Sequence, residues 1–264
     1  MNESLVKYLA GLLDADGSLS LTFRLGRNTE SRYHPGLMMK LSASDAVDQR
    51  GFVESLPALT GMGTVSRYGN SNQFAVWSIS RRADLEMLLP RLIKHMVIKA
   101  RHWQWLLETW RETRGPLCSD AERARLTAAS KRSRVERAGP MHPKNHPTWA
   151  WLAGYLDGDG WYIYRRDVEQ NYWAMNVGAV AHNNDSGVLQ FLQKSFGGNI
   201  RNHGQSPNVS VWVRSLGVRD ASFALRFLPN IAKHSRLKRY KIDQMIHHHR
   251  QRLSVPSSAE QATV

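Results

Sequence analysis

The chain has 264 residues, enough for one large domain or two modest ones with buried cores. It carries 36 Lys and Arg against 22 Asp and Glu, and the net charge of +14 favours a polyanionic partner. It has no apolar run of about 18 residues, so we expect no membrane-spanning segment and no membrane partner. The single cysteine, Cys118, excludes an intrachain disulfide and predicts a soluble intracellular protein, in a prokaryotic cytoplasm or an organelle matrix.

The first predicted element is a helix whose sequence recurs in the second half of the chain. The segment Leu9–Gly17 reads LAGLLDADG, and Leu152–Gly160 reads LAGYLDGDG, with seven of nine positions identical. A repeat at this separation predicts two similar halves. Small residues in the middle of each copy would let the two helices pack closely against each other. We take Ser4 and Thr148 as the N-caps, and the last glycine of each copy as a left-handed residue that ends the helix.

Each copy carries two aspartates in its last helical turn, first Asp14 and Asp16 and then Asp157 and Asp159. Negative charge is unfavourable there, because the C-terminal end of a helix dipole is itself negative. A divalent cation between the two copies would relieve this cost and could also accept backbone carbonyl oxygens. Alternatively, the aspartates accept hydrogen bonds from backbone amides. We favour this alternative for Asp14 and Asp157, and metal binding for Asp16 and Asp159.

Two strands follow the first helix, because polar and apolar residues alternate from Ser18 to Leu25 and again from Leu37 to Ser44. Alternation predicts an antiparallel sheet with one buried face and one open face, here rich in hydroxyls and cations. An ordinary solvated sheet face would show the same pattern. The residues that we assign to the open face are Ser20, Thr22, Arg24, Met38, Lys40 and Ser42, followed in later strands by Ser66, Tyr68 and Gln73.

The end of the first half has a counterpart at the end of the second. Residues 89–99 read LPRLIKHMVIK and residues 228–238 read LPNIAKHSRLK, which pairs Lys99 with Lys238. These matches predict halves at residues 1–115 and 146–255. Between them we expect a basic linker, 116–145, with a helix over Ser119–Arg137, and after them a disordered tail, 256–264. The tryptophan-rich stretch from Trp103 to Trp110 predicts a helix packed under a sheet.

The strands of the second half are less clear, because residues 161–166 and 172–182 are apolar or aromatic on both faces. The candidates for its open face, counted from the motif and then from the later strands, are Ile163, Arg165, Asp167, Arg201, His203, Asn208 and Ser210. These residues differ from those at the matching positions of the first half, so we expect each half to recognise a different part of the polyanionic partner. We interpret His247–His249 as the solvated end of the last helix, because no Cys or acid stands at zinc-ligand spacing.

The two motifs resemble those of the LAGLIDADG homing endonucleases, in the form with two motifs in one chain. The resemblance covers most of the chain and implies an α+β fold of two pseudo-twofold-related αββαββα halves. Each half would contribute a four-stranded antiparallel sheet to a DNA-binding saddle. The resemblance also implies that Asp16 and Asp159 are metal-binding catalytic acids, and that the carbonyl groups of Ala15 and Gly158 face the metal. Lys99 and Lys238 resemble the family's basic residue near the scissile phosphate, which orients solvent or stabilises charge.

The activity implied by this resemblance is that of a monomeric, site-specific endonuclease. It would make a double-strand break in a long, asymmetric DNA target by phosphodiester hydrolysis, and so promote the mobility of its own gene. The expected cofactor is Mg²⁺, with two or more divalent ions shared between the motifs, and the open sheet faces would read base edges in the major groove. Two alternatives remain, a maturase that binds its own intron RNA and a non-cleaving, sequence-specific DNA-binding protein on the same fold. The acids retained in both motifs favour cleavage.

Overall fold

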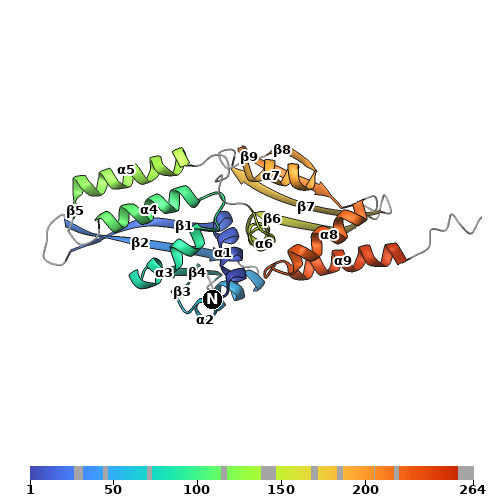
Figure 1. Ribbon diagram of the computed structural model, residues 1–264, viewed down its shortest axis with the longest axis horizontal. Coiled ribbons are helices and arrows are strands. Elements are labelled where there is room, and N and C mark those ends of the chain that lie inside the picture. The colour runs from blue at the N-terminus through green and yellow to red at the C-terminus, as the bar shows by residue number, and fades with distance from the viewer. Residues whose placement is uncertain are drawn as a thin grey trace, which may run out of the picture.

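The computed structural model describes residues 1–26, 32–43, 47–69, 73–113, 118–137, 147–167, 172–182, 187–204, 206–216 and 220–254. These residues form two halves that lie side by side along the long axis of the molecule (Figure 1). Each half has the order helix, two strands, helix, two strands, two helices. The predicted α+β architecture of two similar halves is therefore confirmed. Residues 116, 117 and 138–145 of the predicted linker, and the predicted tail 256–264, lie outside the described residues.

The first half is built on a sheet with the strand order β1-β2-β4-β3, in which all neighbours are antiparallel. Helices α2 and α4 pack on this sheet. A short strand, β5, pairs with the start of β2 and leads into α5, which forms where the sequence predicts a basic helix. The elements are α1 (Glu3–Asp16), β1 (Gly17–Leu25), β2 (Arg32–Ala43), α2 (Val47–Thr60), β3 (Thr64–Tyr68), β4 (Phe74–Ile79), α3 (Arg82–Ile93), α4 (Ala100–Thr113), β5 (Cys118–Ser119) and α5 (Asp120–Arg137).

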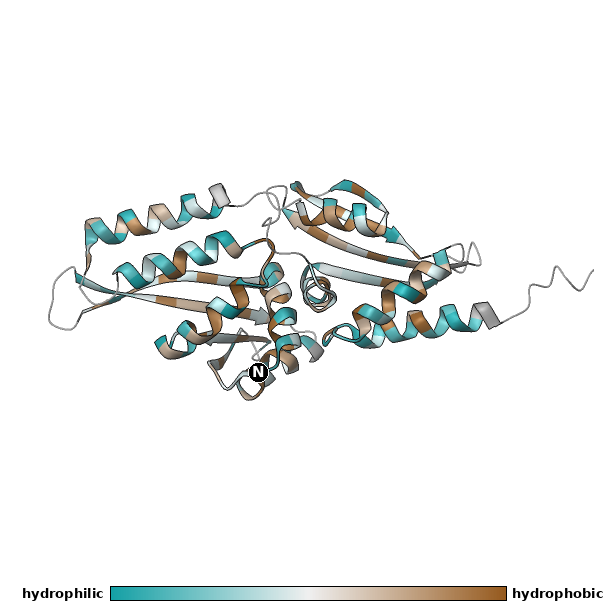
Figure 2. Cartoon of the chain, viewed as in Figure 1, coloured by the Kyte–Doolittle hydropathy of each residue, from teal (hydrophilic) through white to brown (hydrophobic). Residues whose placement is uncertain are grey.

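The second half repeats this design with the strand order β6-β7-β9-β8. Helix α7 packs on β7, β8 and β9, and α9 packs on β6. The elements are α6 (Trp149–Asp159), β6 (Gly160–Asp167), β7 (Tyr172–His182), α7 (Gly187–Phe196), β8 (Asn199–His203), β9 (Ser206–Ser215), α8 (Ala221–Ala232) and α9 (Arg239–Ser254). None of the helices in the described part of the chain is both long and apolar enough to cross a bilayer. Figure 2 shows α5 and α9 as largely hydrophilic and stretches of β2 and β7 as hydrophobic.

Burial follows the predicted alternation in the first sheet. Leu19 is buried between the exposed Ser18 and Ser20, and in β2 Leu41 is buried between the exposed Lys40 and Ser42. The alternation fails at the end of β1, where Leu25 is 63% exposed. Strand β2 also begins at Arg32, earlier than predicted, and the predicted end at Ser44 lies outside the described residues.

Matched tryptophans anchor the two cores. The indole Nε1 of Trp77 donates to the carbonyl oxygen of Met62 at 2.9 Å, and that of Trp212 donates to the carbonyl oxygen of Gly197 at 2.8 Å. Both side chains are fully buried. Each bond ties β4 or β9 to the turn before the neighbouring strand, and it satisfies an indole N–H that would otherwise be buried without a partner. Trp103, on α4, is also buried, as predicted for a helix packed under the sheet.

The helix ends depart from the sequence predictions. Thr148 caps α6 as predicted, but α1 begins earlier and its cap is Asn2, whose Oδ1 accepts the Leu5 amide at 2.8 Å, so the assignment to Ser4 was wrong. Gly17 and Gly160 are extended, with φ of −77° and −99°, and not left-handed. Glycine is needed there for space, because a Cβ on Gly160 would lie 2.5 Å from the Leu156 carbonyl oxygen.

The histidines near the end of α9 are also not as predicted. His248 and His249 are only 8% and 1% exposed, so the interpretation of a solvated helix end was wrong for both. His248 Nδ1 lies 3.3 Å from the hydroxyl of Tyr164, on β6. The packing of α9 on the second sheet therefore buries residues that look like surface residues in the sequence.

Candidate functional site

The two motif helices, α1 and α6, are in direct backbone contact at the centre of the molecule (Figure 1). A Cβ on Gly11 would lie 1.9 Å from the carbonyl oxygen of Trp151, and a Cβ on Gly154 would lie 2.0 Å from that of Tyr8. Neither position has room for a methyl group. The small residues repeated in the sequence are therefore what lets the two helices approach.

The C-terminal ends of the same helices also meet. A Cβ on Gly158 would lie 2.5 Å from the Cβ of Ala15 and 2.8 Å from Oδ2 of Asp16. The carboxylate of the first motif thus lies against the second motif, one residue before Asp159. This convergence arises because the helices pack in parallel along their glycines.

The first aspartate of each motif is buried and saturated with hydrogen bonds. Asp14 accepts the backbone amides of Val97 and Lys99, at 2.6 and 2.8 Å, and the indole Nε1 of Trp151 at 2.9 Å. Burial raises the pKa of Asp14, while the backbone amides and the indole act in the opposite direction. The predicted role as an acceptor of backbone amides is confirmed for Asp14.

Asp157 repeats this arrangement in the second motif. It accepts the backbone amides of Arg236 and Leu237, at 2.8 and 3.0 Å, and the hydroxyl groups of Ser235 and Tyr8, at 2.7 and 2.8 Å. Tyr8 occupies the same place in its motif as Trp151 does in the other. Each motif helix therefore donates one side-chain hydrogen bond to the buried aspartate of its partner.

The second aspartate of each motif has a different environment. The Asp16 side chain is exposed, and none of the described residues donates a hydrogen bond to it. Protein atoms around the Asp16 carboxylate displace water, and this desolvation raises the pKa of Asp16. The charges of Lys99 and Lys238 act in the opposite direction but do not cancel the rise. Asp159 is half-buried, and its charge acts on Lys238.

The two lysines predicted from the repeat donate hydrogen bonds to the carbonyl groups at the C-terminal ends of the motif helices. Lys99 Nζ donates to the carbonyl oxygens of Leu13, Ala15 and Gly17 at 2.9–3.0 Å. Lys238 Nζ donates to the matching carbonyls of Leu156, Gly158 and Gly160, at 2.9, 3.2 and 2.5 Å. Desolvation lowers the pKa of Lys238, and the nearby Asp157, Asp16 and Asp159 oppose this shift. The lysines thus supply positive charge where the helix dipoles are negative.

The donor set at this point fits a divalent cation. Asp16 brings a carboxylate to which none of the described residues donates a hydrogen bond. The carbonyl oxygens of Ala15 and Gly158 each keep a second lone pair beside the lysine bond. In the described part of the chain, no three His, Cys, Asp or Glu side chains gather as a metal site. Mg²⁺ does not require such a cluster, because it takes one or two carboxylates and completes its shell with water and substrate phosphate.

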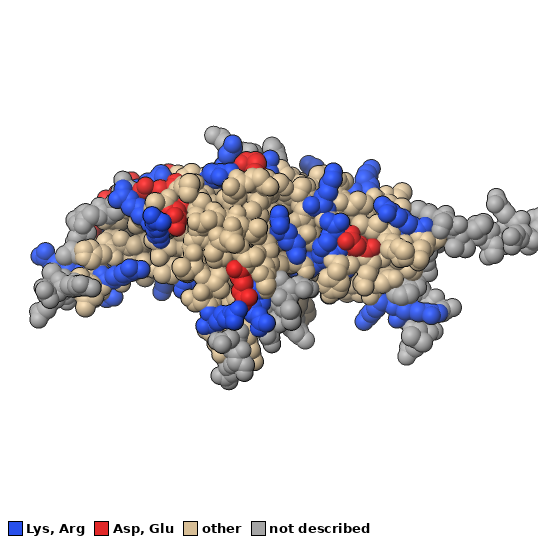
Figure 3. Space-filling view, turned by 90° about the horizontal axis from the view of Figure 1, so that it is seen from below, with Lys and Arg blue, Asp and Glu red and all other residues tan. Residues whose placement is uncertain are grey.

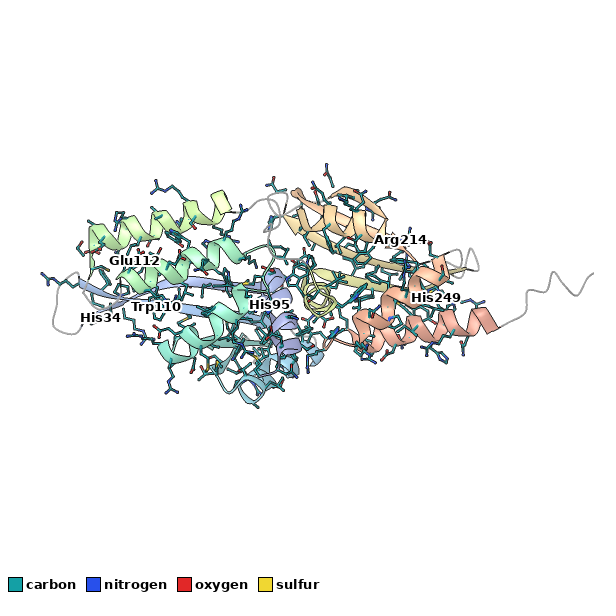
Figure 4. All side chains as sticks on the ribbon, in the orientation of Figure 1. His34, His95, Trp110, Glu112, Arg214 and His249 are labelled. Carbon is teal, nitrogen blue, oxygen red and sulfur yellow. The ribbon has the colours of Figure 1, made fainter. Side chains whose placement is uncertain are left out.

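The open face of the first sheet gathers most of the residues predicted for it. Ser20 pairs with Met38, and Arg24 pairs with His34, which is also exposed. Ser66 and Tyr68, on β3, continue the same face, whereas Gln73 lies just before β4. His34 was not among the predicted residues, although the alternation of β2, extended back to Arg32, would have found it. Figure 4 shows His34 at the outer end of this sheet.

The candidates of the second half are divided between the two faces of their sheet. Ile163 and Arg165 lie on the open face, opposite the core face of Tyr162. Arg201 pairs with Val211, next to Val180 on the open face. Ser210 instead pairs with Ala181 and Asn202, on the side that carries the buried Trp212, so the structure does not bring it together with Arg201. Asn208, His203 and Asp167 lie near strand ends, where β8 has a bulge and β6 pairs with Tyr172.

The surface is basic in both halves. In Figure 3, Lys and Arg side chains are spread over the whole length of the molecule and outnumber the acidic ones. This distribution agrees with the net charge of +14.

No family model and no curated protein sequence matches the chain. Solved structures match its fold over nearly its full length. The LAGLIDADG homing endonuclease I-GzeII in complex with its DNA target has a TM-score of 0.70 and 13% identity, over 97% of this chain and 94% of that one.

A second solved protein, I-SmaMI, matches in several states. Bound to uncleaved DNA target in the presence of calcium ions, it has a TM-score of 0.65 and 14% identity, over 99% of this chain and 96% of that one. Bound to cleaved DNA, it has a TM-score of 0.67 and 15% identity, over 99% and 94% of the two chains. At these identities the likeness concerns the fold alone, which this chain shares with the solved LAGLIDADG homing endonucleases.

Proposed function

We propose that the protein is a site-specific, Mg²⁺-dependent DNA endonuclease that makes a double-strand break in a long, asymmetric target. The observation that carries this proposal is the convergence of the two motif ends, which puts the Asp16 carboxylate against Gly158, next to Asp159. A stability argument does not account for these acids, because acids at helix C-termini are unfavourable. DNA-bound neighbours of the same fold support the choice of DNA as the partner.

In this proposal Asp16 and Asp159 hold the divalent ions, with help from the carbonyl oxygens of Ala15 and Gly158. A bound ion would supply an activated water and stabilise the leaving oxygen of the phosphodiester. One acid from each motif suits a duplex, in which two strands must be cut. Since both motifs lie in one chain, a monomer is sufficient.

The two lysines have a supporting role. Lys99 and Lys238 hold the carbonyl groups next to the acids and place positive charge near them. This charge lowers the pKa of Asp16 against the larger rise that desolvation causes, and it would stabilise the charge that develops on a phosphate at the same point. The open faces of the two sheets, with their exposed hydroxyls and cations, would read base edges on either side of the cut. Cleavage at a long, rare target is the activity that gene mobility requires.

The test is cleavage of a library of randomised duplexes in Mg²⁺, followed by sequencing of the cut ends. We expect one long site without palindromic symmetry, and no cutting when EDTA replaces Mg²⁺. Asp16→Asn and Asp159→Asn should each retain DNA binding and lose double-strand cleavage. Asp243→Asn makes the same chemical change at a 50% exposed carboxylate on α9 and should cut normally. Full cleavage by either motif variant, or a library without cut molecules, would reject the proposal.

A further inference from the structure

The two sheets have the same strand order, so every open-face position in one half has a counterpart in the other. The row next to the motif end is polar in the first sheet and mostly apolar in the second. In register across the strands, the first row is Ser18, Lys40, Ser78 and Thr64. The second row is Trp161, Gly178, Val213 and Asn199. Two hydroxyls and a cation are thus replaced by an indole, a glycine and a valine.

The indole of Trp161 lies across the neighbouring strand. A Cβ on Gly178 would lie 2.2 Å from Cζ2 of Trp161, so the ring occupies the space where a side chain of β7 would stand. This overlap is on the open face, because Val177 and Ala179, on either side of Gly178, are fully buried on the core face. Trp161 itself is half-buried. On the open face, the Trp161 indole therefore covers the position of Gly178, which corresponds to Lys40 in the first half.

In each adjoining row one hydroxyl is replaced in the same way, although Asn176 stands where the first sheet has Met38. Val180 stands where the first sheet has Ser42, and Ile163 stands where it has Ser20. Together, Trp161, Ile163, Val180 and Val213 form an apolar strip, and all four side chains keep part of their surface exposed. Exposed cations flank the strip, with Arg165 further along β6 and Arg201 on β8.

An apolar strip between cations, continuous with the candidate DNA interface, matches one feature of the major groove. Thymine is the base that presents a methyl group there, and apolar side chains read it by contact, whereas hydroxyls and lysine read donors and acceptors. We propose that the apolar strip of the second half binds thymine methyl groups, so that this half-site is read by apolar contact and the first half-site by hydrogen bonds. This inference rests on the proposed function, because it assigns a specificity to the same DNA face.

The test compares thymine with deoxyuracil, which lacks only the methyl group. In the target recovered from the library, all thymines of one half-site at a time are replaced by deoxyuridine, and the dissociation constants are measured. Replacement in the second half-site should weaken binding about fourfold for each methyl group that the strip buries. Replacement in the first half-site should change it less than about twofold. Equal effects in both half-sites, or a second half-site without thymine opposite the strip, would overturn the inference.

Two variants exchange strip residues for their first-half counterparts. Val213→Ser introduces the residue of Ser78, and Val180→Ser that of Ser42, so each should reduce the effect of deoxyuridine in the second half-site. Circular dichroism reports whether they fold, and the measurement on the unaltered protein does not depend on them. The outcomes also separate the two proposals. A protein that cuts its target but ignores the methyl groups refutes only the reading mode, whereas one that cuts no duplex refutes the endonuclease itself.

Discussion

The hydrogen bond from Tyr8 to Asp157 joins the two motif helices, and Tyr8→Phe removes it with little change in shape. The phenol donates to Oδ2 at 2.8 Å, and the two side chains are 1% and 0% exposed. Burial and the charge of Asp157 raise the pKa of Tyr8, so its hydroxyl stays protonated and can donate. A hydrogen bond to a charged group contributes about 1.5–3 kcal/mol. We expect the free energy of unfolding to fall by about that amount and no more, because Asp157 keeps its three other donors.

Urea unfolding with linear extrapolation measures this loss. A double-mutant cycle with Asp157→Asn then isolates the pair, and we expect a coupling energy above about 1 kcal/mol. Tyr240→Phe is the matched control, since that side chain is 53% exposed and should change stability by less than about 0.5 kcal/mol. If Tyr8→Phe were as mild as Tyr240→Phe, or the cycle showed no coupling, the bond would not hold the two helices together.

The remaining predictions concern the same centre. Gly11→Ala should lower the free energy of unfolding by more than about 3 kcal/mol or prevent folding, because its Cβ would lie 1.9 Å from a backbone oxygen. Gly51→Ala, whose Cβ would have nothing within 4 Å, should raise the free energy of unfolding measured in urea by about 0.5–1 kcal/mol. Desolvation raises the pKa of Asp16, so its ionised form destabilises the fold at neutral pH. Asp16→Asn should therefore raise the melting temperature at pH 7. This gain should vanish below pH 3.8, the ordinary pKa of the carboxyl, because the group is then protonated in both the folded and the unfolded protein. Lys238→Met removes the donor for three carbonyls and should lower the free energy of unfolding, measured in urea, by about 1–3 kcal/mol. Lys94→Met, at an exposed lysine, should lower it by less than about 0.5 kcal/mol.

The repeat allowed the architecture to be predicted, because a close helix contact and a charged helix end both leave local signals. The glycine in each LAG triplet marks the contact, and the paired aspartates mark the end. Exact helix boundaries left weaker signals. Asn2 and Ser4 are both good N-caps, and the choice depends on which amide the side chain can reach, which only the folded backbone decides.

Burial in the second half depends on partners distant in the sequence. Tyr162 and Trp161 are both aromatic, so alternation could not assign a face, and pairing of β6 with β7 was needed to place Tyr162 in the core. Ser210 lies two residues before Trp212 on β9 and shares its face, and the pairing of β9 with β7 is what identifies that face as the core side. His249 lies on the same helical stripe as the buried Ile242, Met245 and Ile246, so the 3.6-residue period of α9 could have placed it in the core.

The two aspartates of one motif differ in role because a helix turns between them. Residues two apart point about 200° away from each other around the axis, so when Asp14 faces the core, Asp16 must face out. The buried member organises the exposed one. Asp14 binds the Trp151 indole of the partner helix and the backbone amide of Lys99, and this fixes the lysine that holds the Ala15 carbonyl. A single path of hydrogen bonds thus runs from one motif helix, through a buried carboxylate, to the residue beside the exposed acid of the other. Motif positions that never touch the solvent therefore set where the outward-facing acids stand.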